Sequence, residues 1–211
     1  MASTLNWDKR RATTFKIVSV ANLILFLAVY VPLNYFGAIH GAALFLFSWE
    51  KIIPLIPWMI VPYISFNLLF IVPLMVIPSE VVRRVGVTFA ITTVSAGTIF
   101  LLFPTHNAFP QIVPQGLFSS LFLGLYSVDL PSNMFPSLHV AYSTLFLLFS
   151  YPYIRNRSLK IVFVCWVGVV IASTVLTHQH HVMDVIGGLV LAGACWLLSE
   201  LSTVLGTPKE R

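Results

Sequence analysis

Charged residues are scarce in this chain of 211 residues. Lys and Arg number 12 and Asp and Glu number 7, so 9% of the residues are charged, against about 25% in a typical soluble domain. Hydrophobic residues make up 58% of the chain, and the mean hydropathy is +0.91. A soluble protein of this length keeps only about two thirds of its extended-chain surface buried, too little to hide so much apolar area. The composition therefore excludes an ordinary soluble enzyme, a disordered chain and a nucleic-acid-binding protein.

Cysteine is rare as well, and Cys165 and Cys195 both lie inside apolar runs. They therefore carry little information about the redox compartment. Long apolar runs, in contrast, are abundant, and a run of about 18 or more such residues predicts a membrane span. Six runs of about this length predict an all-α integral membrane bundle of six transmembrane helices, at Ile17–Phe36, Pro57–Ile77, Val85–Phe103, Leu138–Tyr153, Leu159–Leu176 and Val182–Leu205.

The basic residues fall almost entirely on one side of these spans. Eleven of the 12 lie there, and Lys51 is the exception. The positive-inside rule then places both termini in the cytoplasm, so the net charge of +5 is a topology signal and no nucleic-acid partner is needed to explain it. We expect a single multi-pass membrane domain over residues 1–211, with a cytoplasmic N-terminal segment 1–16, a core 17–205 and a cytoplasmic tail 206–211.

The longest outer loop is not simply polar. It contains an apolar stretch, Gly116–Tyr126, that is too short to span a membrane. A short helix lying at the membrane interface fits this stretch. Before it lies His106, one of the few outer groups able to carry a positive charge.

Two polar segments at the outer ends of the spans carry the groups best suited to chemistry. Asn133–His139 leads into the fourth span, and Ser173–Asp184 joins the fifth span to the sixth. Between them the chain crosses the membrane inward and then outward, so topology alone brings His139 and His180 to the same face.

The first segment has the features of an anion site. Pro136 suits the first turn of a helix, where its missing N–H is not needed. The free backbone N–H groups of Ser137, Leu138 and His139 would then face the outer headgroup layer, where the helix dipole favours an anion.

The second segment pairs a histidine with a carboxylate. His180 and Asp184 are four positions apart at a helix start and share one face. A carboxylate on one imidazole nitrogen fixes the tautomer and makes the other nitrogen a better nucleophile, which leaves His139 to act as general acid. Each residue alone has a structural explanation, such as a polar loop histidine or a first-turn acid. Together, at membrane depth in a chain with so few charges, they indicate a catalytic site.

The two segments together resemble the type 2 phosphatidic acid phosphatase superfamily. The residues that carry the resemblance are Phe135-Pro136-Ser137-Leu138-His139, then Ser173-Thr174, His180 and Asp184, and the similarity covers about Glu50 to Leu205. Leu138 stands where the phosphatases usually have glycine, which is similar to the inositolphosphotransferase-like branch. The resemblance implies a helical bundle, no metal or other cofactor, and a phosphohistidine intermediate. By position it implies that His180 is the nucleophile, that Asp184 orients it, that His139 is the acid and that Ser137 lies in the phosphate-binding turn.

The sequence departs from the superfamily where cations are expected. The motif Lys-x6-Arg-Pro is absent, and Thr174 replaces the arginine that usually follows the serine of the third motif. Arg83 and Arg84 are predicted on the opposite side of the membrane. A phosphodiester carries one negative charge and needs less compensation than a phosphomonoester dianion. The candidate substrate-binding residues are Pro136, Ser137, Leu138, His106, Ser173, Thr174 and His178.

These observations predict a membrane lipid phosphatase or phosphotransferase. We expect it to cleave a lipid phosphoester at the outer face, periplasmic, extracellular or luminal, and to favour phosphodiester headgroup transfer to water or a lipid alcohol acceptor. A phosphomonoester lipid phosphatase is the nearest alternative. A metal-dependent membrane enzyme that uses His139, His180 and Asp184 as ligands and a non-catalytic lipid carrier stay open.

Overall fold

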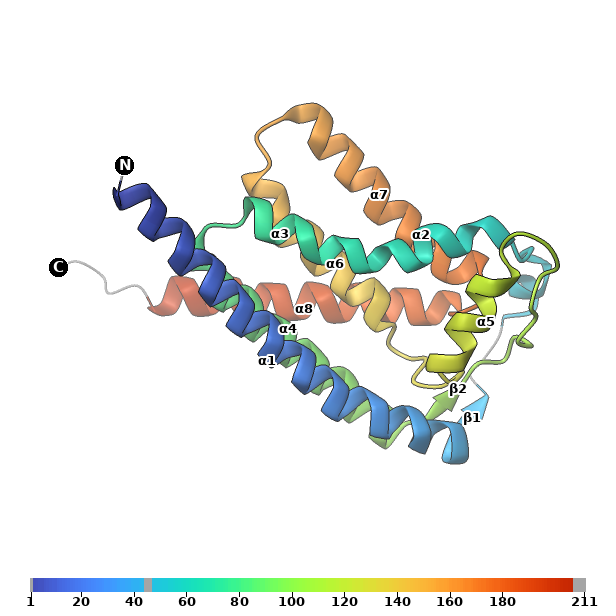
Figure 1. Ribbon diagram of the computed structural model, residues 1–211. Coiled ribbons are helices and arrows are strands. Elements are labelled where there is room, and N and C mark those ends of the chain that lie inside the picture. Colours follow the sequence, from blue (N-terminus) through green and yellow to red (C-terminus); the bar gives the residue numbers. More distant parts are fainter. Residues whose placement is uncertain (1, 44–46, 207–211) are drawn as a thin grey trace.

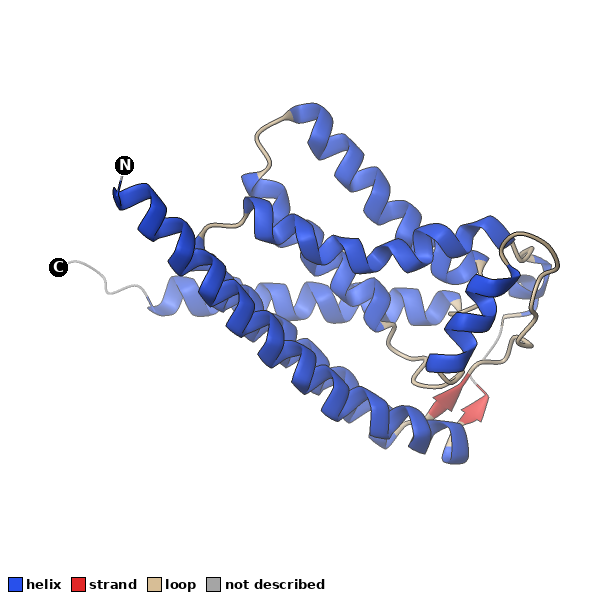
Figure 2. Cartoon of the chain, viewed as in Figure 1, coloured by secondary structure: helices blue, strands red, loops and turns tan. Residues whose placement is uncertain are grey.

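The computed structural model of the chain describes residues 2–43 and 47–206, so most of the expected tail 206–211 lies outside the described residues. Helices dominate the described part, with one short pair of strands (Figure 2). The long helices α1, α4, α7 and α8 and the shorter α6 are arranged so that α1 begins and α8 ends at one end of the bundle (Figure 1). The short helix α5 and the strands β1 and β2 lie at the opposite end. The bounds of the main elements are α1 Ala2–His40, β1 Ala42–Ala43, α4 Ser79–Leu102, β2 Thr105–His106, α5 Ser119–Val128, α6 Leu138–Ser150, α7 Arg157–Leu176 and α8 Val182–Gly206.

Four helices in the described residues are long and apolar enough to cross a membrane. They cover Ala12–His40, Ser79–Leu102, Arg157–Leu176 and Val182–Thr203. The predicted all-α, membrane-compatible architecture is confirmed to this extent. The other two predicted spans correspond to shorter helical segments.

The predicted second span is a chain of short helices. The segment consists of η2 (Pro57–Met59), α2 (Ile60–Ser65), η3 (Phe66–Phe70) and α3 (Ile71–Val76). Pro62 and Pro73 lie inside α2 and α3. Because proline has no N–H and its ring clashes with the carbonyl four residues earlier, a continuous α-helix is broken there. The two prolines account for the division of this segment into short helices, with the 3₁₀-helix η3 between them.

Helix α6 forms the centre of the core. Its residues Val140, Ala141 and Leu145 are completely buried, and it contacts α3, α4, α7 and α8. With 13 residues, α6 is about 20 Å long, and η4 (Tyr151–Tyr153) extends its C-terminal end.

Glycines set the close approach of α1 to α4. A Cβ on Gly86 would come within 2.2 Å of Val18 Cγ1, and one on Gly97 within 2.3 Å of Val29 Cγ1. Small residues at such crossings are typical of membrane helices, whose association depends on close packing.

A layer of short elements covers the end of the bundle opposite the start of α1. Strands β1 and β2 pair in parallel, with Ala42 opposite Thr105. Helix α5 packs its buried Phe122 against Ile60 and Tyr63 of α2. The short helix expected around Gly116–Tyr126 is thus present as α5, nearly at the predicted position.

Candidate active site

The turn between α7 and α8 positions His180. After Thr177, the C-cap of α7, His178 takes a left-handed conformation with φ of 57°. The His178 N–H bonds the Val175 carbonyl at 2.9 Å, and the Gln179 N–H bonds the Thr174 carbonyl at 3.0 Å. This is the Schellman pattern that commonly ends a helix, with histidine where glycine is the usual residue. The N–H of His180 also donates to Thr174, at 2.9 Å, so the position of His180 is fixed through its backbone.

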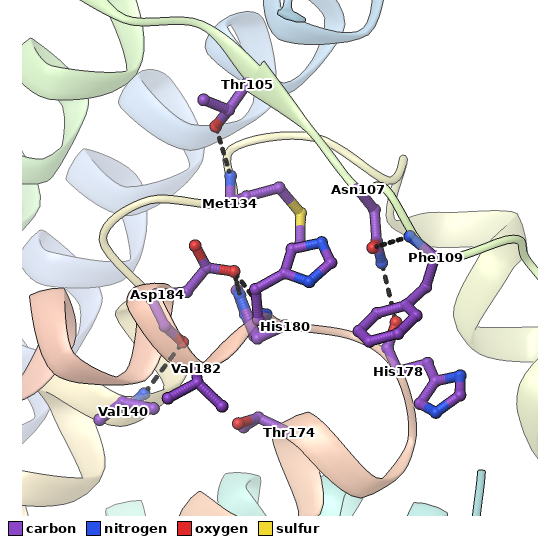
Figure 3. Close-up of polar contacts among 12 residues, drawn as sticks. Thr105, Asn107, Phe109, Met134, Val140, Thr174, His178, His180, Val182 and Asp184 are labelled. Atoms are coloured by element: carbon purple, nitrogen blue, oxygen red, sulfur yellow. Dashed lines mark hydrogen bonds and ion pairs between the residues drawn. The ribbon is translucent and has the colours of Figure 1, made fainter. Parts of the chain in front are cut away.

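Asp184 holds the side chain of His180. One carboxylate oxygen, Oδ2, lies 3.2 Å from His180 Nδ1 and accepts the backbone N–H of His181 at 2.8 Å (Figure 3). Asp184 is completely buried, and His180 is 8% exposed. Because the carboxylate accepts, Nδ1 of His180 carries the proton and Nε2 keeps its lone pair. The arrangement leaves Nε2 as the nitrogen able to act as a nucleophile.

The start of α6 is joined directly to the start of α8. The N–H of Ser137 donates to the backbone carbonyl of Asp184 at 3.1 Å. A Cβ on Gly188 would come within 2.6 Å of the Ser137 carbonyl oxygen, and one on Gly187 within 2.4 Å of the Phe135 ring. Only glycine at these two positions lets the segment before α6 lie against α8, which brings both polar segments into one site.

His139 lies on the first turn of α6 between aromatic rings. Its imidazole stacks on Tyr63 with a centroid distance of 4.5 Å and lies 4.5 Å from Phe66. The rings of His139 and His180 are 6.2 Å apart and inclined by 57°. Among the described residues neither nitrogen of His139 has a hydrogen-bond partner, so the ring is free to exchange a proton. The structure therefore brings together His139, His180 and Asp184, the three residues predicted to carry the chemistry.

The N-terminus of α6 differs from the prediction in two details. Ser137 is the N-cap, and its hydroxyl accepts the Val140 N–H at 3.3 Å. Pro136 consequently precedes the helix instead of occupying its first turn. The Ser137 N–H is already used by Asp184, which leaves the N–H groups of Leu138 and His139 without partners among the described residues. These two groups remain available to an anion, as expected at a helix N-terminus.

The other predicted binding residues are held in structural contacts. The hydroxyls of Ser173 and Thr174 donate to carbonyls of their own helix, at 2.6 and 2.8 Å, and both side chains are buried. His178 Nε2 lies 3.0 Å from the Ile53 carbonyl. His106 Nδ1 lies 3.2 Å from the Asn107 carbonyl. Among the described residues, no hydrogen bond, ion pair or ring contact joins these four side chains to the side chain of His139 or His180.

Glu50 and His181 form a second buried pair that the sequence analysis missed. Glu50 Oε2 lies 3.3 Å from His181 Nδ1, and Oε1 accepts the Val182 N–H at 3.0 Å. His181 Nε2 accepts the Ala108 N–H at 3.1 Å, and the ring stacks on Phe109. Nε2 of His181 is thus engaged, and its Nδ1 faces Glu50 without a hydrogen bond among the described residues, whereas Nε2 of His180 is free. The only available sequence signal was the scarcity of acids on the outer face.

Burial dominates the titration of His181. Desolvation lowers the pKa of its imidazole below the ordinary value, opposed by the carboxylates of Asp184 and Glu50. The lowered pKa agrees with the bond from the Ala108 N–H, because only a neutral imidazole has a nitrogen that accepts. His181 is therefore neutral, and its hydrogen bond from Ala108 joins that segment to the start of α8.

The arginines of α4 lie far from this site. Arg84 pairs with Glu200 and donates to Ser199 at 2.7 Å. Glu200 follows Asp184 by 16 positions on α8, a separation of about 24 Å along the helix axis. Arg84 cannot reach a phosphate bound at His180, as expected from the predicted topology. Lys51 is exposed on η1 (Ser48–Ile52).

No group of three or more His, Cys, Asp or Glu with a metal-binding arrangement occurs within residues 2–43 and 47–206. The predicted site residues form a pair of histidines, and the one carboxylate, Asp184, contacts Nδ1 of His180.

Residues 54–198 match the family model described as the PAP2 superfamily. The matched segment covers more than two thirds of the chain and contains His139, His180 and Asp184. No curated protein and no solved structure matches the chain significantly.

Proposed function

Since the chain belongs to the PAP2 superfamily, we propose that it is an integral membrane enzyme that cleaves a lipid phosphoester through a phosphohistidine intermediate. The observation that carries this proposal is the arrangement of two imidazoles. His180 has one nitrogen fixed by Asp184 at 3.2 Å, and its ring centroid lies 6.2 Å from that of His139. A phosphorus atom between the rings meets a nucleophile on one side and a proton donor on the other.

The proposed reaction has two steps. In the first, the lone pair of His180 Nε2 attacks phosphorus, the bond from phosphorus to the leaving oxygen breaks, and His139 gives that oxygen its proton. In the second, an alcohol or water attacks phosphorus, its proton passes to His139, and the P–N bond breaks to restore His180. Asp184 stabilises the positive charge on the imidazole while the P–N bond exists.

The charges around the site favour a phosphodiester over a phosphomonoester. The backbone N–H groups of Leu138 and His139 at the start of α6 suit an oxygen of the phosphoryl group. Arg84 is engaged with Glu200 at the other end of α8. A diester with one negative charge needs less compensation than a dianion. Together with Leu138 in the Pro-Ser-Leu-His segment, this supports headgroup transfer of the inositolphosphotransferase-like kind.

We further propose six membrane spans with both termini in the cytoplasm. Helices α1, α4, α7 and α8 are four of them, and the kinked segment from η2 to α3 and the short helix α6 are the other two. The basic residues at the inner end and the catalytic groups at the outer end support this orientation.

Incubation of the purified protein with a panel of lipids tests the proposed reaction. The panel contains phosphatidic acid, an isoprenoid phosphate and phosphatidylinositol, the last with and without an acceptor lipid, and His180→Ala is the control. The proposal predicts transfer of the inositol phosphate headgroup and no turnover by the variant. Release of inorganic phosphate from the monoesters as the main activity would favour the alternative monoester phosphatase. Turnover that survives in His180→Ala would overturn the mechanism.

A further inference from the structure

A long cavity lies beside the candidate active site. Its volume is about 720 Å³, and α1, the segment from α2 to α3, α4 and α6 contribute its walls. Along α1 the lining residues run from Phe15 to Tyr35, a distance of about 30 Å for 20 helical steps. This equals the thickness of the hydrocarbon core of a bilayer. The cavity is therefore deep enough to hold a hydrocarbon chain that passes beyond the outer leaflet.

The polarity of the lining changes along the cavity. Phe15, Val18 and Val85 line the inner end together with the uncharged Ser19 and Asn22, whereas Asp129 and His139 line the outer end. These two are the only acidic or basic side chains among the described lining residues. Ligand sites typically combine apolar walls with a few polar groups that fix orientation. The lining thus matches a molecule with one polar end and one long apolar chain.

Asp129 is the polar group that the proposed reaction does not use. It follows α5, and its Oδ1 accepts the Tyr30 hydroxyl at 2.8 Å. Burial raises the pKa of Asp129, while the Tyr30 hydroxyl and His180 act in the opposite direction. A carboxyl group repels a phosphate oxygen, so Asp129 is unsuited to the phosphoryl group. Its second oxygen suits a hydrogen-bond donor from a ligand in the cavity.

A hydroxyl fits this position better than an ammonium group. Tyr30, Tyr63 and Leu130 line the same cavity as Asp129. Transferring a neutral hydroxyl into such surroundings costs less than transferring a charge. Tyr63 also stacks on His139, so a hydroxyl held here lies next to the residue that takes protons in the proposed second step.

We propose that this cavity binds the lipid alcohol acceptor, with its hydrocarbon chain along α1 and its hydroxyl held by Asp129. The role of the bound lipid as an acceptor rests on the proposed function. Binding of the lipid in the cavity can be tested without turnover. In the transfer step the hydroxyl leaves Asp129 and turns its hydrogen to His139, its oxygen attacks the phosphorus on His180, and its proton passes to His139. The P–O bond forms as the P–N bond breaks, and the nitrogen keeps the electron pair.

Photo-crosslinking tests the site directly. The probe is a diacylglycerol with a diazirine at the end of one acyl chain, added to the full-length protein in phosphatidylcholine nanodiscs. The matched probe is the same lipid with its hydroxyl methylated. We expect labelled peptides from the inner half of α1 and from α3, and at least several-fold less labelling with the methyl ether. Equal labelling by both probes, spread over the lipid-facing surface, would overturn the proposal.

Two tryptophan variants on α1 provide the structural control. Leu27 lines the cavity, whereas Ile24 does not, and both side chains are about half exposed or more. Because neither is a core residue, both variants should fold. Leu27→Trp is expected to reduce cavity labelling about tenfold, and Ile24→Trp to leave it unchanged. Equal effects of the two variants would contradict an occupied cavity.

Asp129→Leu separates the acceptor role from the chemistry. We expect it to lower transfer to the lipid alcohol at least tenfold while hydrolysis by water, which does not need the lipid hydroxyl, falls less. Equal losses of transfer and hydrolysis would overturn the acceptor role. If His180 becomes phosphorylated but the probe does not label the cavity, this inference fails and the proposed function stands. If the probe labels the cavity but no phosphohistidine forms, the lipid site stands and the proposed function fails.

Discussion

Replacing Asp184 by asparagine tests how the site activates its nucleophile. Asparagine keeps the size of the side chain, and its carbonyl oxygen can still accept the His181 N–H that Asp184 binds at 2.8 Å. The substitution removes the negative charge that lies 3.2 Å from His180 Nδ1. The fold of the turn should therefore persist while the imidazole loses its counter-charge.

The distance sets the size of the expected effect. When Nε2 of His180 bonds to phosphorus the imidazole becomes positive, and its attraction to a carboxylate about 3.2 Å away is about 5 kcal/mol at an effective dielectric constant of about 20. This is an upper limit. The loss of one hydrogen bond to a charged group, about 1.5–3 kcal/mol, sets the lower limit. At about 1.4 kcal/mol per tenfold in rate, kcat should fall between about tenfold and several-thousandfold.

Glu50→Gln is the matched control. Glu50 is equally buried and also faces a histidine, at 3.3 Å, but that histidine is His181 and not the proposed nucleophile. Steady-state turnover of a lipid phosphodiester by both variants, with thermal unfolding in the same detergent, separates the two roles. We expect Asp184→Asn to lose far more activity than Glu50→Gln at a similar unfolding midpoint. Equal losses in both variants would refute the reasoning, because they would indicate a general structural effect.

Three further predictions follow from the same geometry. Gly188→Ala places a Cβ within 2.6 Å of the Ser137 carbonyl, so overpacking should lower the free energy of unfolding by about 1–3 kcal/mol. Gly193→Ala has open space at its Cβ and should stabilise α8 by up to about 1 kcal/mol. Thermal unfolding of the two variants compares these effects, and equal unfolding midpoints would contradict the close approach of Gly188 to Ser137. The lowered pKa of His181 means that His181 binds more protons in the unfolded chain than in the folded one, so stability should fall as the pH drops below about 6.5. His181→Gln should reduce this dependence of the unfolding midpoint on pH. An unchanged dependence would contradict the contribution of His181. His139→Gln should slow first-turnover cleavage of natural diesters by about two orders of magnitude or more. First-turnover release of nitrophenolate from a lipid nitrophenyl phosphodiester should slow much less, because that leaving group needs no proton. Equal losses in the first turnover of both substrates would exclude His139 as the acid.

Local rules predicted much of the fold. The long apolar runs predicted six spans, and four of them correspond to helices that are long and apolar enough to cross a membrane. The helix-spaced pair His180 and Asp184 lies at the start of α8 as expected, because a separation of four positions on one helix fixes their relative placement.

The contacts that complete the site depend on distant segments. Glu50 and Val182 are 132 positions apart, and Tyr30 and Asp129 are 99 positions apart. Neither contact follows from a repeat or a motif, because each depends on how a loop returns onto the bundle. The first residue of α6 could not be predicted from local sequence either, because Pro136 suits a first turn while Ser137 is a good N-cap. The bond from the Val140 N–H to the Ser137 hydroxyl shows that Ser137 is the N-cap and that the helix begins at Leu138.

The most direct test of the central claim is the detection of phosphate on His180 during turnover. Rapid acid-free quenching of the enzyme with a phosphodiester lipid labelled in its headgroup, followed by mass spectrometry of the peptides, measures the intermediate. The account predicts a modified His180 that accumulates when the acceptor lipid is left out, disappears when it is added, and is absent in His180→Ala. Productive turnover with no modified histidine, or with the label on another residue, would contradict it.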